Sequence, residues 1–262
     1  MVIGGGFINK GFTLAVSGKG GVGKTNLTAM LVKHLSKIGS VLAIDADPDS
    51  NLPQALGVNV KRTVGDERES ILNMPSRDLG AGGKIQAFEK TLHMTIEETS
   101  DFDILVMGRS EGEGCYCSVN HILRQAIDSR ASSYDFTLID CEAGLEHLSR
   151  RTTRDVDIMI MVTDPTLNGI MTARRVQELS GELCVSFVDM MVVANRVVAE
   201  TRPFLDKMAQ ENGLEIAAYI PYDPMIAQFD VLGKPTIELP EDSAAFVAVA
   251  EIRDKILACT TA

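Results

Sequence analysis

The sequence predicts an α/β fold with a doubly wound, mostly parallel central sheet of about seven or eight strands, flanked by helices. Three observations favour this fold. Short apolar segments alternate along the chain with segments of helical spacing. Most of the apolar segments are continuous, as in strands that are covered on both faces. The first of them leads through a glycine-rich loop into a helix. We therefore expect right-handed crossovers and a ligand site at the carboxyl ends of the strands.

The expected elements follow one another along the whole chain. The segments expected to form strands are residues 12–17, 41–45, 104–108, 136–140, 158–163, 190–195 and 216–220. The segments expected to form helices are residues 26–37, 85–98, 119–129, 169–179, 202–212 and 242–257. Residues 60–81 are charged and contain glycine and proline, so we expect an irregular insertion there. The chain has no evident linker or repeat, so residues 1–262 are expected to form one domain, with residues 1–11 as a non-core extension.

The composition argues against several partner classes. The chain has 25 Lys and Arg against 36 Asp and Glu, a formal net charge of -11, whereas a nucleic-acid partner requires a basic face. No apolar run approaches the roughly 20 residues of a membrane span, and no basic secretory leader is evident. We therefore expect a cytoplasmic protein without a membrane or nucleic-acid partner. Disulfides are not expected among five cysteines in that compartment, so closely spaced cysteines point to metal or redox chemistry.

Residues 18–25 read GKGGVGKT and fit the phosphate-loop template G-x-x-x-x-G-K-[ST]. In such a loop, backbone N–H groups surround phosphate oxygens, and the helix N-terminus behind them adds about half a positive charge. Lys24 is expected to reach the β- and γ-phosphates, and the Thr25 hydroxyl to ligate Mg²⁺. The alternative is an ordinary glycine-rich turn, which the flanking strand and helix disfavour. The expected nucleotide contacts are Gly20, Gly21, Val22, Gly23, Lys24, Thr25 and Asn26.

An acidic loop follows the second expected strand and contains Asp45, Asp47 and Asp49. This loop should face the phosphate loop, because the carboxyl ends of parallel strands share one edge of the sheet. One carboxylate can orient or deprotonate a water molecule, and another can hold Mg²⁺ through water. The alternative, an acidic turn that caps the next helix, explains Asp49 better than Asp45 and Asp47.

The fourth expected strand is an apolar run that ends on Asp140, which is the Walker-B pattern of a carboxylate that supports the Mg²⁺ shell. Gly144 lies four residues further on, where a backbone N–H can sense the γ-phosphate. Such a contact gives a loop one state with ATP and another after hydrolysis. The strand-then-aspartate signal is weak alone and gains strength from its place after a phosphate loop.

The base of the nucleotide is expected to lie near the ends of the last two strands. An asparagine at a strand end can hydrogen-bond the amino and ring nitrogens of adenine, so we interpret Asn195 as the base reader. A turn asparagine without a ligand is the alternative. Pro221 and Tyr222 follow the last strand and can pack on the purine.

Cys115 and Cys117 follow the third expected strand and alternate about Tyr116, so an extended chain places both thiols on one side. The N-terminus of a helix that starts near Ser118 would favour the thiolate, the metal-binding form. Two thiolates are too few for a closed soft-metal site, but a two-fold dimer would gather four, tetrahedral for Zn²⁺ or square-planar for Ni²⁺. A buried apolar role and a redox pair are the alternatives.

The additional lysine of GKGGVGKT resembles the deviant Walker-A ATPases, among them the nitrogenase iron protein, MinD, and the arsenite and tail-anchored-protein ATPases. The resemblance implies that Lys19 reaches across a homodimer interface to the partner's nucleotide. It also implies that Asp47, the aspartate before Pro48, activates the attacking water. Hydrolysis of ATP to ADP would then depend on dimerisation, and Lys19, Lys24 and Asp47 are the expected catalytic residues.

Three segments together resemble the CooC/AcsF family of nickel-insertion ATPases: the Cys-Tyr-Cys-x-x-Asn run, the acidic loop, and residues 143–150, AGLEHLSR. The similarity extends from about Phe12 to the C-terminal helix. It implies that Cys115 and Cys117 bind nickel, or zinc in its place, between two chains. It also implies a client metalloenzyme, carbon monoxide dehydrogenase or acetyl-CoA synthase. Asn26 departs from the family, because many relatives have a threonine there at an α-phosphate contact.

Two other functions remain open at this point. A membrane-cycling regulator of the MinD kind would need a basic amphipathic C-terminal helix, whereas the terminal helix here mixes acidic and basic residues. An iron–sulfur electron-transfer ATPase would need two well-separated cysteines per chain, and Cys141 is the one candidate mate for Cys115.

Overall fold

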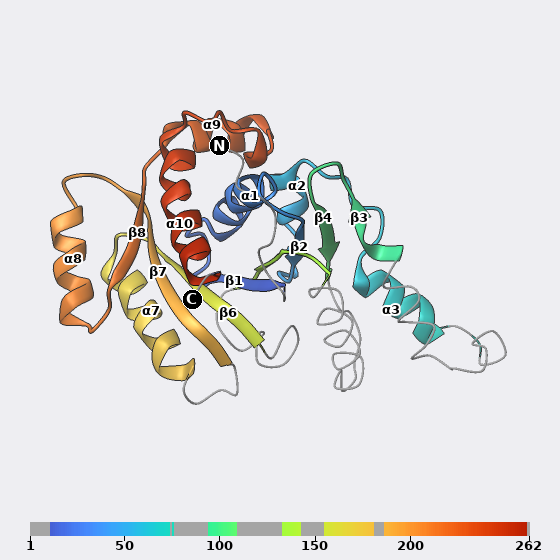
Figure 1. Cartoon of the computed structure of the whole chain (residues 1–262), viewed down its shortest axis with the longest axis horizontal. Helices are drawn as coiled ribbons and strands as arrows, with labels where there is room; N and C mark the ends of the chain where they lie inside the picture. The colour runs from blue at the N-terminus through green and yellow to red at the C-terminus, as the bar shows by residue number, and fades with distance from the viewer. Residues whose placement is uncertain are drawn as a thin grey trace.

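The computed structural model describes residues 11–73, 75, 94–108, 133–142, 155–180 and 186–260, and every structural statement below concerns these residues. They contain an eight-stranded sheet in the order β3-β4-β2-β5-β1-β6-β7-β8, with helices on both faces (Figure 1). The strands are β1 (Phe12–Gly18), β2 (Val41–Asp45), β3 (Glu97–Glu98), β4 (Asp103–Val106), β5 (Phe136–Asp140), β6 (Asp155–Thr163), β7 (Ser186–Val197) and β8 (Ile216–Pro221). The helices are α1 (Lys24–Leu35), α2 (Leu52–Leu56), α3 (Val64–Asn73), α7 (Leu167–Ser180), α8 (Arg202–Glu211), α9 (Pro224–Leu232), η2 (Thr236–Glu238, a 3₁₀ turn) and α10 (Ala244–Thr260).

The predicted fold class is confirmed. All paired strands run parallel except β3 and β4. β1 lies between β5 and β6, and β2 lies between β4 and β5. The register aligns Asp45 of β2 with Asp140 of β5, and Val16 of β1 with the same Asp140. The strand register therefore brings the phosphate loop and both carboxylates to one edge of the sheet.

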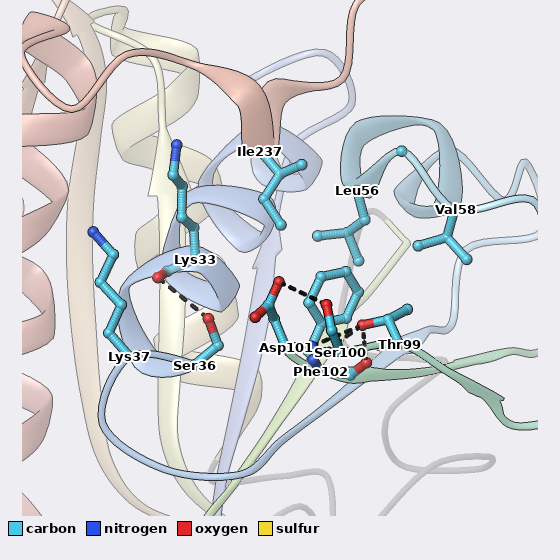
Figure 2. A pocket seen from close by; sticks show the side chains of 11 residues that line it. Lys33, Ser36, Lys37, Leu56, Val58, Thr99, Ser100, Asp101, Phe102 and Ile237 are labelled. Atoms are coloured by element: carbon cyan, nitrogen blue, oxygen red, sulfur yellow. Dashed lines mark hydrogen bonds between the residues drawn. The ribbon is translucent and has the colours of Figure 1, made fainter.

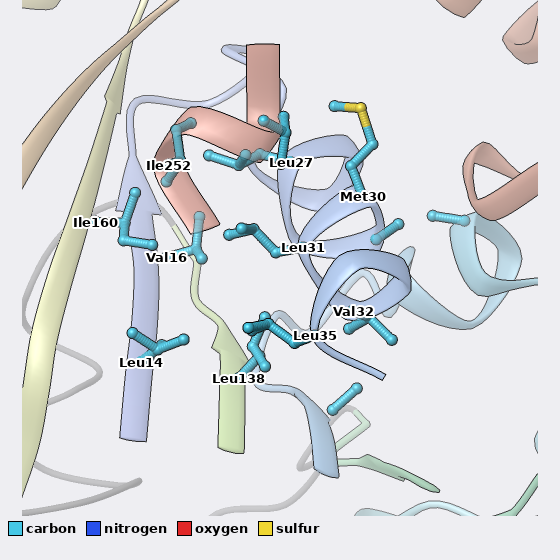
Figure 3. Close-up of a cluster of buried hydrophobic side chains, with 14 of the residues drawn as sticks. Leu14, Val16, Leu27, Met30, Leu31, Val32, Leu35, Leu138, Ile160 and Ile252 are labelled. Atoms are coloured by element: carbon cyan, nitrogen blue, oxygen red, sulfur yellow. The ribbon is translucent and has the colours of Figure 1, made fainter. Parts of the chain in front are cut away.

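Two hydrophobic cores cover the two faces of the sheet. The first lies between the sheet and α1, α2 and α10, and Figure 3 shows Leu31 and Leu35 of α1 facing Leu14, Val16 and Leu138 of the strands. All five of these side chains are fully buried. The second core lies on the other face and includes residues of α3, α7 and α8. Burial on both faces explains why the strands are continuous apolar runs in the sequence.

The predicted helix over residues 85–98 is correct at residues 94–95, which are helical, and wrong at residues 97–98. Glu97 and Glu98 form β3, which pairs antiparallel with Ile104 and Asp103 of β4. The chain reverses in a tight turn, because the Thr99 N–H donates to the Phe102 carbonyl at 3.1 Å. Residues 85–93 of that prediction, and the whole predicted helix over residues 119–129, lie outside the described residues.

The predicted irregular insertion over residues 60–81 is wrong for residues 64–73, which form α3, whereas residues 60–63 have no regular structure and residues 74 and 76–81 lie outside the described residues. A capping box begins this helix: the Thr63 N–H donates to the Asp66 carboxylate at 2.8 Å, and the Asp66 N–H donates to the Thr63 hydroxyl at 3.2 Å. Buried Val64 and Ile71 then attach α3 to the second core. The pattern Thr-x-x-Asp was present in the sequence and predicts this helix start.

Candidate nucleotide-binding site

The phosphate loop connects the central strand β1 to the N-terminus of α1. Lys19, Gly20 and Gly21 are exposed, whereas Val22 is buried beneath them. α1 begins at Lys24, and Gly23 before it has φ 93°, a left-handed conformation that favours glycine. The exposed loop backbone and the positive end of a helix of 12 residues together form an anion site of the kind that binds phosphates.

Asn195, at the end of β7, holds this loop in place. Its Nδ2 donates to the carbonyl of Val22 at 2.8 Å, and its Oδ1 accepts from the N–H of Arg196 at 2.9 Å. A Cβ added to Gly23 would come within 2.5 Å of the same Nδ2, so the amide lies directly against the loop. The contact joins residues 173 positions apart, and no local sequence pattern predicts it. The interpretation of Asn195 as an adenine reader stays a prediction.

Thr25 and Asp140, both expected near Mg²⁺, lie in direct contact. The Thr25 hydroxyl donates to Asp140 Oδ2 at 2.6 Å, and the Thr28 hydroxyl lies 3.5 Å from Asp140 Oδ1. Lys24 begins α1 beside them and is 8% exposed. A hydroxyl and buried carboxylates are hard oxygen ligands of the kind that Mg²⁺ prefers, so this donor set fits the ion.

Asp45 organises the acidic loop that carries Asp47. It is fully buried, and its two oxygens accept from the N–H groups of Asp47 and Leu52, each at 3.0 Å. The carboxylate therefore anchors both ends of the turn between β2 and α2. Asp47 itself is half-buried, and its Oδ1 accepts from the Asp49 N–H at 3.0 Å. The loop thus holds Asp47 in place, close enough to Asp140 for its charge to help raise the pKa of Asp140.

Burial makes ionisation of the two aligned carboxylates costly. It raises the pKa of Asp45 to about 7, because the hydrogen bonds from Leu52 and Asp47 offset burial only in part and Asp140 adds like charge. Burial also raises the pKa of Asp140 to about 6, although the Thr25 hydroxyl and the Lys24 ammonium oppose the shift. A divalent cation at this edge of the sheet would relieve the repulsion between them.

One cavity, of about 170 Å³, is lined by the residues that the sequence predicts near the nucleotide base, and we call it the base cavity. Its lining residues are Asn26, Met30, Asn195, Arg196, Pro221, Tyr222, Asp223, Ile226, Ala227 and Asp230. Three of them belong to α9, a helix that the sequence analysis missed. The signals for α9 were present: Asp223 before Pro224 is an N-cap followed by proline at the first helical position, and Gly233 follows the last turn.

Asp223 caps two helices at once. Its Oδ1 accepts from the Met225 N–H of α9 at 2.9 Å, while its Oδ2 accepts from the Ser243 hydroxyl at 2.6 Å and the Ala245 N–H of α10 at 3.1 Å. Burial of the carboxyl would raise its pKa, but these donors outweigh burial and lower it. The ionised carboxylate therefore holds one wall of the base cavity to the C-terminal helix.

Replacing Asp223 with alanine should remove both caps and lower the free energy of unfolding by about 2–3 kcal/mol. Because the folded-state pKa is lowered, the charge stabilises the fold above the unfolded-state pKa of 3.8, and this contribution is lost as pH falls through the folded-state pKa. Urea denaturation at pH 7 measures the effect. Asp242→Ala, an exposed neighbour, is the control and should stay within about 0.5 kcal/mol of the wild type. Equal stabilities of the two variants would contradict the double cap.

A second cavity of about 530 Å³ lies where α1 ends, beside the turn between β3 and β4. Figure 2 shows Leu56, Val58 and Ile237 across from Asp101 and Phe102. The neighbouring Lys33 and Lys37 ammonium groups are engaged elsewhere, with the Leu239 carbonyl at 2.7 Å and Glu241 at 2.6 Å. This cavity contains none of the residues that the sequence predicts for the nucleotide.

The predicted metal site cannot be placed, because Cys115 and Cys117 lie outside the described residues, as does Gly144. Within the described ranges, no three His, Cys, Asp or Glu side chains form a group that could hold a metal ion. Cys141 is buried, and burial raises the pKa of its thiol, which favours the protonated form that binds metals poorly.

None of the helices in the described part of the chain is long and apolar enough to cross a membrane.

Comparison with known proteins gives one family and several relatives. Residues 13–236 match the model of the CobQ/CobB/MinD/ParA nucleotide binding domain. An uncharacterized ATP-binding protein of Methanocaldococcus jannaschii is 50% identical over 93% of this chain and 98% of its own length. The carbon monoxide dehydrogenase accessory protein CooC of Rhodospirillum rubrum is 30% identical over 86% of this chain and 89% of its own. Among solved structures, MinD of Pyrococcus horikoshii with Mg-ADP is 25% identical over 95% of this chain and 98% of that chain, at a TM-score of 0.65.

Proposed function

Because the chain belongs to the CobQ/CobB/MinD/ParA family of nucleotide-binding domains, we propose that it is a dimeric, ATP-hydrolysing nickel metallochaperone. Cys115 and Cys117 of two chains would bind one Ni²⁺, which is then delivered to a carbon monoxide dehydrogenase or an acetyl-CoA synthase. One observation carries this proposal: the Cys-x-Cys run occurs in a chain that is 30% identical to a carbon monoxide dehydrogenase accessory protein over most of its length.

The described residues include a candidate for each part of an ATPase. The loop backbone and Lys24 would bind the phosphates, and Thr25 with Asp140 would hold Mg²⁺, which supplies charge neutralisation during phosphoryl transfer. Asp47 would orient and deprotonate the attacking water, and Asp45 keeps the loop that carries it in position. The strands that lead to these groups, β1, β2 and β5, end at the same edge of the sheet, and this supports the proposal.

The dimer links the nucleotide to the metal. Lys19 is exposed on the open side of the phosphate loop, as a side chain that reaches a partner's nucleotide must be. A two-fold assembly that brings Lys19 to the partner's ATP would also bring two Cys-x-Cys runs together. Metal binding and nucleotide binding would then favour the same dimer, and each would raise the affinity for the other by the same factor.

A nickel titration tests the proposal. Under reducing conditions, with gel filtration and metal analysis, we expect one tightly bound Ni²⁺ per dimer, with an affinity that changes when ATP or ADP is added. Cys117→Ala should abolish tight binding. Cys259→Ala, which changes a half-buried thiol in α10, is the matched control and should bind as the wild type does. Absence of tight binding in every nucleotide state would exclude the metallochaperone function.

The second candidate is a dimerising switch ATPase of the MinD kind that has no metal role, favoured by the similarity to MinD of Pyrococcus horikoshii. It predicts nucleotide-dependent dimers that do not respond to nickel. The membrane step of such a regulator has little support, because Phe246, Val249, Ile252 and Ile256 of α10 are buried in the core and cannot face a lipid surface.

A further inference from the structure

The two asparagines of the base cavity differ in how their amide groups are used. Asn195 commits its Nδ2 to Val22 and its Oδ1 to Arg196, so both ends of its amide hold protein backbone. Asn26, in the first turn of α1, uses only its Oδ1, which accepts from the Thr236 hydroxyl at 3.0 Å. Among the described residues, no acceptor takes the hydrogens of Asn26 Nδ2. Both hydrogens of Asn26 Nδ2 are therefore available at this cavity, whereas Asn195 Nδ2 has given one of its two to Val22.

Thr236 holds one end of the Asn26 amide. Thr236 begins η2, 210 positions away in the sequence, and is 3% exposed. This hydroxyl holds the carboxamide by donating to Oδ1, and in that arrangement neither hydrogen of Nδ2 is used by Thr236. Asn26 also lines the base cavity, so this orientation leaves the Nδ2 donors for whatever occupies it.

The charge of the cavity suits a base better than a phosphate. Two carboxylates, of Asp223 and Asp230, line it beside one cation, Arg196, and the carboxylate of Asp223 is held ionised by its three donors. The phosphate loop is the better site for a phosphate, because its backbone and Lys24 offer N–H groups and positive charge. Pro221 and Tyr222 instead give the cavity flat walls that suit a neutral ring.

We propose that Asn26 is a base-recognition residue of this chain. Its Nδ2 donates to a ring-nitrogen acceptor of adenine, and Thr236 acts as the positioning residue that holds the amide at Oδ1. Asn195 fixes the phosphate loop. The contact differs from the α-phosphate role that the sequence suggests for position 26. The inference concerns nucleotide binding alone and does not depend on the nickel function.

Binding of three probes by isothermal calorimetry in the presence of Mg²⁺ separates the possibilities. The probes are ATP, 2′-deoxy-ATP and inorganic tripolyphosphate, which has no base. Asn26→Ala should weaken ATP and 2′-deoxy-ATP about 3- to 10-fold and leave tripolyphosphate within 2-fold, as expected for loss of one hydrogen bond. Thr236→Val, of similar shape, should give the same pattern. Thr236→Ser retains the hydroxyl and should restore wild-type selectivity.

Several results would overturn the proposal. Equal weakening of ATP and tripolyphosphate by Asn26→Ala would assign Asn26 to a phosphate. A penalty that disappears with 2′-deoxy-ATP would assign it to the sugar. An unchanged ATP affinity would show no contact at all. A wild-type chain that binds neither ATP nor tripolyphosphate would exclude nucleotide binding itself, whereas failure to bind nickel would leave this inference untouched. Thermal unfolding without nucleotide checks that every variant is folded.

Discussion

Replacing Gly18 with alanine is expected to destabilise the protein by about 4 kcal/mol or more and to lower Tm by roughly 10 °C. A Cβ at this position would lie 2.2 Å from the backbone oxygen of Val162 and 3.2 Å from Val22. The oxygen cannot move away easily, because Gly18 is paired with Val162 in the parallel ladder between β1 and β6. The only ways to relieve the overlap are to separate two central strands or to displace the phosphate loop.

Gly20→Ala is the matched control, because a Cβ there has no atom within 4 Å and the glycine does not have a positive φ. Its stability without nucleotide should stay within about 0.5 kcal/mol of the wild type. Denaturant melts of both variants, with no nucleotide present, make the comparison. A Gly18→Ala protein as stable as Gly20→Ala would mean that β1 and β6 are less closely packed at Val162 than the structure describes.

Local patterns in the sequence predict much of this fold. The bounds of β2 and β5 are as expected, because each is a continuous apolar run that ends on an aspartate. The same reasoning places Asp45 and Asp140 at one edge of the sheet, and the strand register confirms that they are aligned. Buried parallel strands leave this clear signal because both faces require apolar side chains.

The errors arise where a local pattern is short or a contact is long-range. β3 has two residues and depends on pairing with β4, so no periodicity distinguishes it from a helix end. α3 and α9 were missed although Thr63 and Asp223 are recognisable N-caps. Asn26 meets Thr236 across 210 positions, and only the assembled fold shows that contact. Side-chain roles within a predicted site are therefore less predictable than the place of the site.

Replacing Asp140 with asparagine is expected to stabilise the metal-free protein while it removes function. The carboxylate is 1% exposed and aligned with Asp45, so ionising it in the fold is costly. An asparagine keeps an acceptor for Thr25 and removes the charge. Without metal and nucleotide, we expect a gain on the order of 2 kcal/mol at pH 8, since one pKa unit corresponds to about 1.4 kcal/mol.

The sign of the pH dependence follows from the direction of the shift. The pKa of Asp140 is raised from 3.8 to about 6, so the folded protein binds this proton more tightly than the unfolded chain does. The group therefore favours folding most at low pH, and that contribution is lost as pH rises through about 6. The pKa of Asp45 is raised to about 7, so this group also favours folding at low pH, and its contribution is lost as pH rises through about 7. The advantage of Asp140→Asn should accordingly be largest at pH 8 and shrink toward pH 4.

Function should change in the opposite direction. Loss of the carboxylate beside Thr25 removes a charge that supports Mg²⁺, so ATP hydrolysis should fall by about 100-fold or more. Thermal melts in EDTA from pH 4 to 8, with phosphate-release assays in Mg²⁺, measure both effects, and the exposed Asp101→Asn is the control for each.

A variant that is less stable than the wild type at pH 8 would show that the Asp140 charge holds the fold. A variant that hydrolyses ATP normally would remove Asp140 from the magnesium site. Both expected effects together would mean that this edge of the sheet keeps two carboxylates at a cost in stability because a cation binds there.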